Sequence, residues 1–285
     1  MSDVYRVTRA ELFKLVRRPS GWVLLGAAVV LSQVFGYLVP YLSYRSGGGD
    51  GEVVGGATPE QLLAGTLPDQ LVANSIGGFP VFVGALALVL GAVMFGGEHN
   101  WGTVKTLLTQ RPGRGRILVG RLLALVVALL VATGVMFTTG AASATAIALA
   151  EGEPVVWPGT GALASGFAAG WLILAMWGVL GAVLGETMRG VALPIGLGVV
   201  WVLGVENLLS ALAGSMLSAL QPVRDVLPGV NAGSLAAAVM PDGLVEPPPG
   251  VTTAVAEPRA LLTLLAYVAG CAVVAVWTAR RRDVA

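Results

Sequence analysis

Long uncharged stretches dominate the chain and alternate with short polar segments. Crossing about 30 Å of hydrocarbon needs roughly 20 apolar residues, and a charge at the centre of such a helix costs about 2.5–3.5 kcal/mol. The stretches therefore predict six transmembrane helices, at 21–42, 76–97, 117–149, 160–185, 190–207 and 260–279. We expect an all-α integral membrane fold with a single membrane domain over residues 1–285.

The third stretch contains one charged residue, Arg121, near its start. A long basic side chain at such a position can snorkel to the headgroups, and the sequence alone predicts this for Arg121. The apolar run that follows is longer than one crossing needs. This helix is therefore expected to tilt or to project beyond the membrane.

Composition and charge add a membrane orientation to this pattern. Hydrophobic residues make up 55% of the 285 residues and charged residues only 12%, whereas soluble domains carry about 25% charged residues. All but three of the 17 Lys and Arg residues fall on the N-terminal side of the predicted membrane, and most acidic residues fall on the other side. The positive-inside rule then predicts cytoplasmic N- and C-termini. Arg-rich usage in an Ala-, Gly- and Val-rich chain suggests a bacterial plasma membrane protein.

The segments outside the spans have distinct patterns. Residues 1–18 form a basic, moderately amphipathic helix with Tyr5, Leu12, Leu15 and Val16 on one side, which predicts an elbow helix in the inner headgroup layer. Residues 46–74 form a Gly-rich outer loop with a short helix from Pro59.

The outer segment 208–257 begins with an apolar stretch, 208–220, that is too short to cross a membrane. Stretches of 10–14 apolar residues are typical of re-entrant or interfacial helices. Two interpretations stay open. Such helices either close the outer end of a transport pathway or pack in the outer leaflet for stability alone.

The inner loop between the second and third spans predicts a short helix at 99–111. Trp101, Val104, Leu107 and Leu108 fall on one face of it, and Lys105 projects elsewhere. One interpretation is a headgroup anchor whose arginines contact anionic membrane lipid. The other is a docking helix for a cytoplasmic partner. Glu98 either caps this helix, where its charge favours the dipole, or is an ordinary interfacial acid.

The order of motifs in this loop resembles the coupling helix of ABC type-2 exporter permeases, whose ATPase is a separate chain. These motifs are Glu98, Gly102-Thr103, Leu107-Leu108, Arg111-Pro112 and Arg114. Glu11 and Lys14 are similar to the Glu-x-x-Lys pattern of the elbow helix in that family. The sequence departs from the pattern at Gly115, which alters the expected fit to the partner.

The resemblance implies a permease subunit of an ATP-driven exporter that moves a hydrophobic or amphipathic substrate, such as a drug, peptide antibiotic or lipid. Its partners would be two copies of a cytoplasmic ABC ATPase, which bind ATP and Mg, and a second permease chain in a homodimer or related heterodimer. The residues that would couple to the ATPase are Glu98, Trp101, Gly102, Thr103, Val104, Lys105, Leu107, Leu108, Arg111, Pro112 and Arg114.

The sequence contains no catalytic machinery that we recognise. Neither Lys14 nor Lys105 follows a glycine, so the Walker phosphate-binding motif is absent. The sole histidine, His99, and the sole cysteine, Cys271, form no ligand cluster. We therefore expect no enzyme activity, metal or cofactor in this chain, no nucleic-acid partner, and ATP hydrolysis in another subunit.

Two alternative functions remain open. Ion-coupled carriers bury acidic residues between spans, and Glu206, at the end of the fifth span, is the candidate here. It is a candidate substrate-path residue or, equally, a boundary residue of an outer helix. The chain would otherwise be an ion-coupled secondary carrier using Glu206, or a non-transporting membrane anchor or assembly protein.

Overall fold

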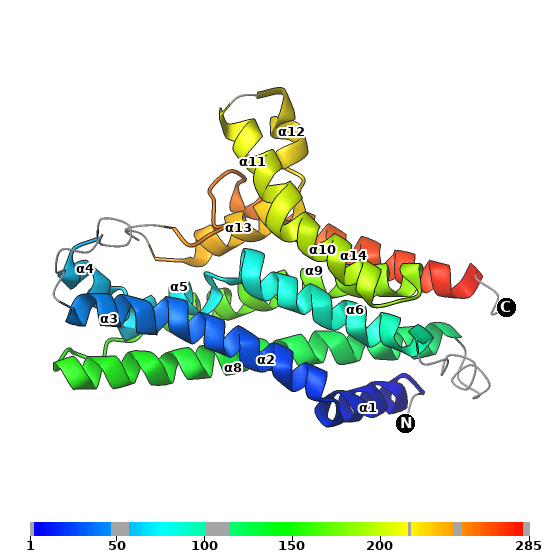
Figure 1. Ribbon diagram of the computed structural model, residues 1–285, viewed down its shortest axis with the longest axis horizontal. Helices are drawn as coiled ribbons and strands as arrows, with labels where there is room; N and C mark the ends of the chain where they lie inside the picture. Colours follow the sequence, from blue (N-terminus) through cyan, green and yellow to red (C-terminus); the bar gives the residue numbers. More distant parts are fainter. Residues whose placement is uncertain (1–2, 47–56, 101–113, 216–217, 242–246, 282–285) are drawn as a thin grey trace.

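The computed structural model describes residues 3–46, 57–100, 114–215, 218–241 and 247–281 (Figure 1). Within these ranges the chain is helical and forms no strand. Six segments are long and apolar enough to cross a membrane, at Pro19–Arg45, Pro68–Gly97, Gly115–Glu151, Thr160–Met188, Ala192–Ser210 and Glu257–Thr278. The predicted all-α fold with six spans is confirmed.

The first two spans are built from several helical pieces each. Helix α1 (Asp3–Arg17) precedes them. The first span consists of α2 (Pro19–Gln33), the π-helix η1 (Val34–Leu38) and α3 (Val39–Arg45). The second span and its approach consist of α4 (Pro59–Ala64), η3 (Pro68–Gln70), α5 (Leu71–Ile76), the π-helix η4 (Phe79–Val83) and α6 (Gly84–Asn100).

The remaining spans include two long uninterrupted helices, α8 (Arg114–Glu151) and α9 (Thr160–Met188). The fifth span consists of α10 (Ala192–Val200), the π-helix η5 (Trp201–Val205) and α11 (Glu206–Ser215). Short helices η6 (Ser218–Leu220), α12 (Gln221–Arg224) and α13 (Pro228–Val239) lead to the last helix, α14 (Glu257–Arg281).

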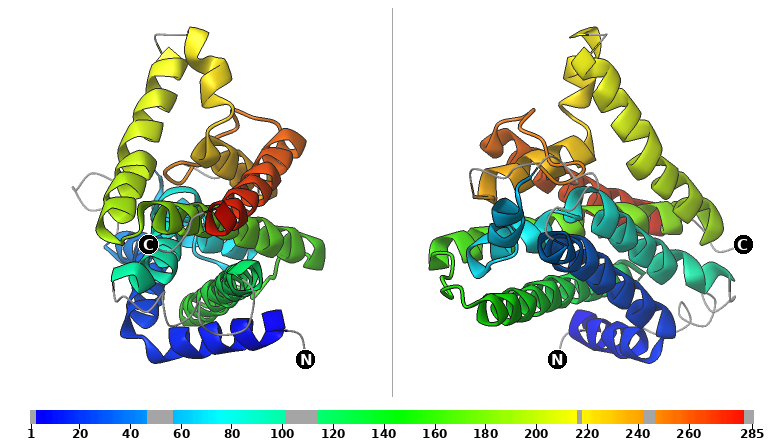
Figure 2. Two further views of the ribbon diagram at one scale, coloured as in Figure 1. Left: turned by 90° about the vertical axis from the view of Figure 1, so that its right-hand side faces the viewer. Right: turned by 60° about the vertical axis from the view of Figure 1, so that its left-hand side comes forward.

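Most spans run along the long axis of the molecule, so the bundle has two ends (Figure 1). We call one the basic end, where α1, the start of α8 and the end of α14 lie. The other is the acidic end, where α4 and the end of α8 lie, while α13 lies nearer the middle of the long axis. Helices α11 and α12 rise away from the body of the bundle in both further views (Figure 2). The fifth span continues into α11 without the break at 207 that the sequence predicts.

Close contact between α6 and α9 forms the centre of the bundle. A Cβ atom on Gly91 would overlap the carbonyl oxygen of Gly178, and one on Gly181 would overlap that of Leu88. Small residues let two membrane helices approach until their backbones touch, which strengthens dispersion contacts between them. The glycines therefore allow the closest helix pairing in the described bundle.

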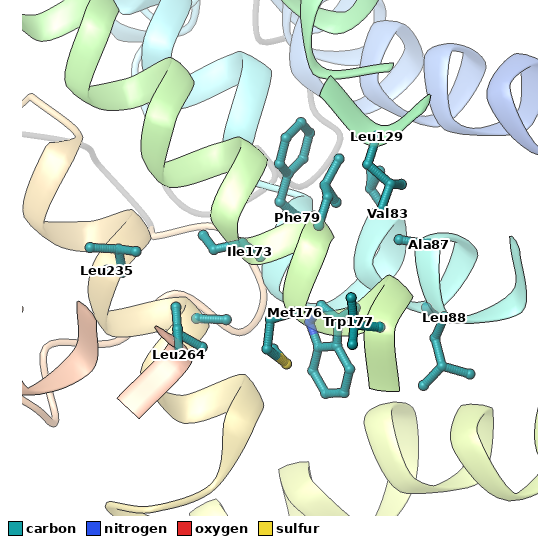
Figure 3. Packing of buried hydrophobic residues seen from close by; sticks show 14 of the residues in the cluster. Phe79, Val83, Ala87, Leu88, Leu129, Ile173, Met176, Trp177, Leu235 and Leu264 are labelled. Atoms are coloured by element: carbon teal, nitrogen blue, oxygen red, sulfur yellow. The ribbon is translucent and has the colours of Figure 1, made fainter. Parts of the chain in front are cut away.

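Large side chains surround this contact (Figure 3). Trp177 is fully buried in α9, and its indole N–H donates a 3.1 Å hydrogen bond to the carbonyl oxygen of Pro80 in η4. Phe79, Leu125 and Ile173 are also fully buried. Because the buried indole N–H has a partner, this aromatic residue packs without an unpaired donor.

Candidate functional site

The two ends of the bundle carry polar groups that the apolar core does not explain. At the basic end, Arg121 of α8 is only 6% exposed. Its guanidinium donates a hydrogen bond to the carbonyl oxygen of Met94 in α6 and lies 4.5 Å from the centre of the Phe95 ring. The expectation that Arg121 snorkels to the headgroups is wrong, because the side chain turns inward and joins two spans.

Helix α1 is attached to the start of α8 beside this arginine. The hydroxyl of Thr8 donates a 3.1 Å hydrogen bond to the carbonyl oxygen of Gly120. A Cβ atom on Gly120 would lie 2.7 Å from a methyl carbon of Val7, so only glycine permits this approach. An exposed ion pair between Asp3 of α1 and Arg116 of α8, at 2.9 Å, adds little stability but is a further contact between these two helices.

The predicted apolar side of α1 divides into two parts. Leu12 and Leu15 pack against the core. Tyr5 and Val16 are more than half exposed, and the predicted position of α1 in the headgroup layer stays a prediction. Glu11 is buried instead, and its carboxylate accepts a 2.7 Å hydrogen bond from Lys14. The Glu-x-x-Lys pattern thus forms an ion pair on α1.

Most of the predicted coupling residues, 101–112, lie outside the residues that the structure describes. Glu98 in α6 and Arg114 in α8 are described by their backbone alone. The helices that flank this segment are described on both sides, because α6 runs to Asn100 and α8 begins at Arg114. Arg121 and Met94 connect these helices one to two turns from the segment.

Glu206 begins α11, where the fifth span rises away from the body of the bundle, and is only 4% exposed. One carboxylate oxygen, Oε1, accepts hydrogen bonds from the backbone N–H groups of Gly229 and Val230, at 2.5 and 3.2 Å. These groups belong to the first turn of α13, where the helix dipole favours a negative charge. The second oxygen, Oε2, has no hydrogen-bond partner among the described residues.

Gly229 makes this contact possible. A Cβ atom at Gly229 would lie 2.8 Å from Oε2 of Glu206 and 2.9 Å from Oε1. A side chain at this position would therefore push the carboxylate away from the end of α13. The sequence indicates Glu206 but not Gly229, because the two residues are distant in the chain and no local motif connects them.

Glu206 lines a cavity of about 140 Å³. Span two contributes Pro80 and Val81 to its wall, and the chain between α13 and α14 contributes Val251 and Thr252. Both apolar and polar side chains therefore surround the carboxylate. The cavity lies where the fifth span, the second span and the outer helices meet.

A second acidic residue, Glu151 at the acidic end, joins the first and third spans. Glu151 ends α8, and its carboxylate accepts hydrogen bonds from the hydroxyl groups of Tyr41, at 2.6 Å, and Tyr44, at 3.1 Å. Arg45 lies 3.4 Å from the same carboxylate. Little of the first span is buried, so this cluster is one of its main polar attachments.

Six apolar spans, a helix packed beside the third span, and polar clusters at both ends define a multi-pass helical membrane protein. The model of the protein family described as "ABC-2 family transporter protein" matches residues 5–284. The chain therefore belongs to the ABC-2 transporter family, whose members are membrane transport components rather than catalytic ones. Membership implies, in general, association with an ATPase subunit and dimerisation. No curated protein shows a significant match to the chain.

Proposed function

We propose that this chain is the permease subunit of an ATP-driven exporter in a bacterial plasma membrane, with its basic end in the cytoplasm. Two copies of a separate ATPase would bind ATP and Mg²⁺ and dock on the segment 98–114. The transported molecule would be hydrophobic or amphipathic, and a second permease chain, identical or related, would complete the transporter.

The connection of α6 to α8 by Arg121 supports this proposal most directly. A partner that pushes on 98–114 moves the end of one helix and the start of the next. Because Arg121 binds the backbone at Met94 and stacks on Phe95, both helices are expected to move together. Such rigid-body motion of packed elements is how interface changes propagate over a distance.

Further contacts extend this unit across the bundle. Helix α1 is held on α8 at Gly120 and Thr8, and α6 contacts α9 through Gly91 and Gly181. A movement at the docking segment would therefore reach the second, third and fourth spans and the elbow helix. The predicted face of Trp101, Val104, Leu107 and Leu108 would supply the apolar contact with the ATPase.

The test is co-purification from membranes followed by transport in vesicles. Tagged protein should retain an ATP-binding chain, and Leu107→Asp or Leu108→Asp should release it while the permease stays folded. The control is Thr58→Asp, which introduces the same charge in the outer loop. A control such as Leu197→Asp is unsuitable, because it would place the charge on the apolar surface of a span. Full transport by vesicles that contain this chain alone under an ion gradient would replace the proposal with a secondary carrier.

A further inference from the structure

The neighbours of Glu206 do not fully match its carboxylate. When ionised, the carboxylate carries one negative charge, whereas the N-terminus of a helix such as α13 supplies only about half a positive charge. The two backbone N–H groups bind Oε1 alone, and Oε2 has no hydrogen-bond partner in the part of the chain described. Capping α13 therefore accounts for one carboxylate oxygen and leaves the other unexplained.

The neighbouring arginine does not neutralise this carboxylate. Arg224 lines the same cavity, but its Nε and Nη2 atoms donate hydrogen bonds of 3.1 and 2.8 Å to Asp225. Arg259 lies 3.8 Å from the same Asp225 carboxylate. The structure describes no ion pair between Arg224 and Glu206. Among the described residues, the cavity wall is therefore left with an acceptor that has no cationic partner.

The size and lining of the cavity indicate what it accepts. A cavity of about 150 Å³ is known to hold a ligand as large as benzene, and this one measures about 140 Å³. Val81, Val202 and Val251 give it apolar walls, while Ser210 and Thr252 add hydroxyl groups near the carboxylate. Exposed Asn207 and half-buried Arg224 belong to the same lining, so the cavity reaches the surface.

We infer that Glu206 and this cavity bind the protonated amine of an amphipathic molecule. The ammonium group donates to the Glu206 carboxylate, and the adjoining carbon chain contacts the valine walls. An ionised acceptor makes such hydrogen bonds roughly twice as strong as neutral ones. This inference rests on the proposed function for its biological purpose and narrows the class of substrate to cationic amphiphiles.

Binding of radiolabelled n-butylamine to the purified chain in nanodiscs tests the site directly. At pH 7 this amine is protonated, as a lysine side chain is. Unlabelled n-butylamine should compete, whereas n-butanol and butyrate, which share its length but lack the positive charge, should not. Equal competition by n-butanol would show an apolar site without charge recognition and would overturn the inference.

Variants locate the binding. Glu206→Gln should weaken amine binding by at least about tenfold, because it removes the charge-assisted hydrogen bond. Glu257→Gln, which changes an exposed acid at the start of α14, should leave binding unchanged. Unaltered binding in Glu206→Gln would overturn the inference.

Two more variants decide the matter if Glu206→Gln does not fold. Ser210→Leu should fill the cavity and abolish binding without touching the carboxylate. Asp225→Asn should weaken binding several-fold, because it leaves Arg224 and its charge beside the incoming ammonium. Full amine binding by both folded variants would overturn the inference.

Amine binding to the purified chain is measured without the ATPase, so it tests the amine site separately from the exporter proposal. Amine binding by a chain that retains no ATPase would refute the exporter proposal alone. Conversely, ATP-driven transport by a chain that binds no amine would refute the amine site alone.

Discussion

Arg121 in α8 binds the backbone carbonyl oxygen of Met94 in α6, so one buried side chain connects the two helices on either side of the proposed docking segment. The backbone acceptor matters, because it ties the guanidinium to the path of α6 rather than to a rotatable side chain. Phe95 covers the guanidinium at 4.5 Å and keeps it away from lipid.

Arg121→Met should keep the volume of the side chain but remove its donors. We expect the free energy of unfolding to fall by about 1.5–3 kcal/mol, the usual contribution of a hydrogen bond to a charged group. Substrate should also no longer stimulate ATP hydrolysis in the reconstituted transporter. Arg116→Met is the matched control, because that arginine is exposed and forms a surface ion pair of small effect. Equal behaviour of the two variants would contradict the role of Arg121.

Gly120→Leu should displace α1 from α8. The new side chain would occupy the position of Val7, which lies 2.7 Å from a Cβ atom there. Spin labels on α1 and α8 should report a longer and broader distance distribution than in the parent protein. Gly134→Leu provides the control on the same helix, since nothing lies within 4 Å of its Cβ position. An unchanged distance in Gly120→Leu would show that α1 is not held at this point.

Gly181→Ala tests the contact between α6 and α9. A methyl group would overlap the carbonyl oxygen of Leu88, so the helices must separate. Overpacking of this kind costs about 1–3 kcal/mol, and rigid backbone neighbours favour the upper end. Gly270→Ala in α14 has open space around it and should gain about 0.5–1 kcal/mol from helix propensity. Thermal unfolding in detergent compares the two, and a neutral Gly181→Ala would count against the close contact.

Tyr41→Phe and Glu151→Leu test the attachment of the first span to the third. Each should lower stability, and a double-mutant cycle should show that the two effects are coupled. The reason is the 2.6 Å hydrogen bond between the Tyr41 hydroxyl and the Glu151 carboxylate. Tyr5→Phe, on the exposed side of α1, should change nothing. Strictly additive effects of Tyr41→Phe and Glu151→Leu would refute the hydrogen bond between these two side chains.

Hydropathy alone predicts the number of spans, because the bilayer requires each of them to be long and apolar. It does not predict which helices touch. Gly181-x-x-x-Gly185 is visible in the sequence, yet a chain with 40 glycines contains many such spacings by chance. Only the fold shows that Gly181 faces Leu88 of another span.

The roles of charged residues near the ends of spans depend on other helices and do not follow from local sequence. Arg121 has the position of a snorkelling residue, and its burial depends on Phe95 and Met94, which lie on another helix. Glu206 is unusual in the sequence because carboxylates are rare in apolar runs. Its partner Gly229 follows from the tertiary placement of α13, which no local pattern encodes. The role of the coupling face at 101–108 stays a prediction.

A π-helical turn, η5 (Trp201–Val205), comes directly before Glu206. Such a turn holds one residue more than the α-helical ladder and is often found at functional positions. Each residue in an α-helix advances the side chain by about 100° around the axis. If the same residues wound as a regular α-helix, the turn would no longer absorb its extra residue, and the Glu206 carboxylate would rotate by about that angle away from the Gly229 N–H group that it now accepts from. The wide turn therefore sets the direction in which the only acid of the fifth span points.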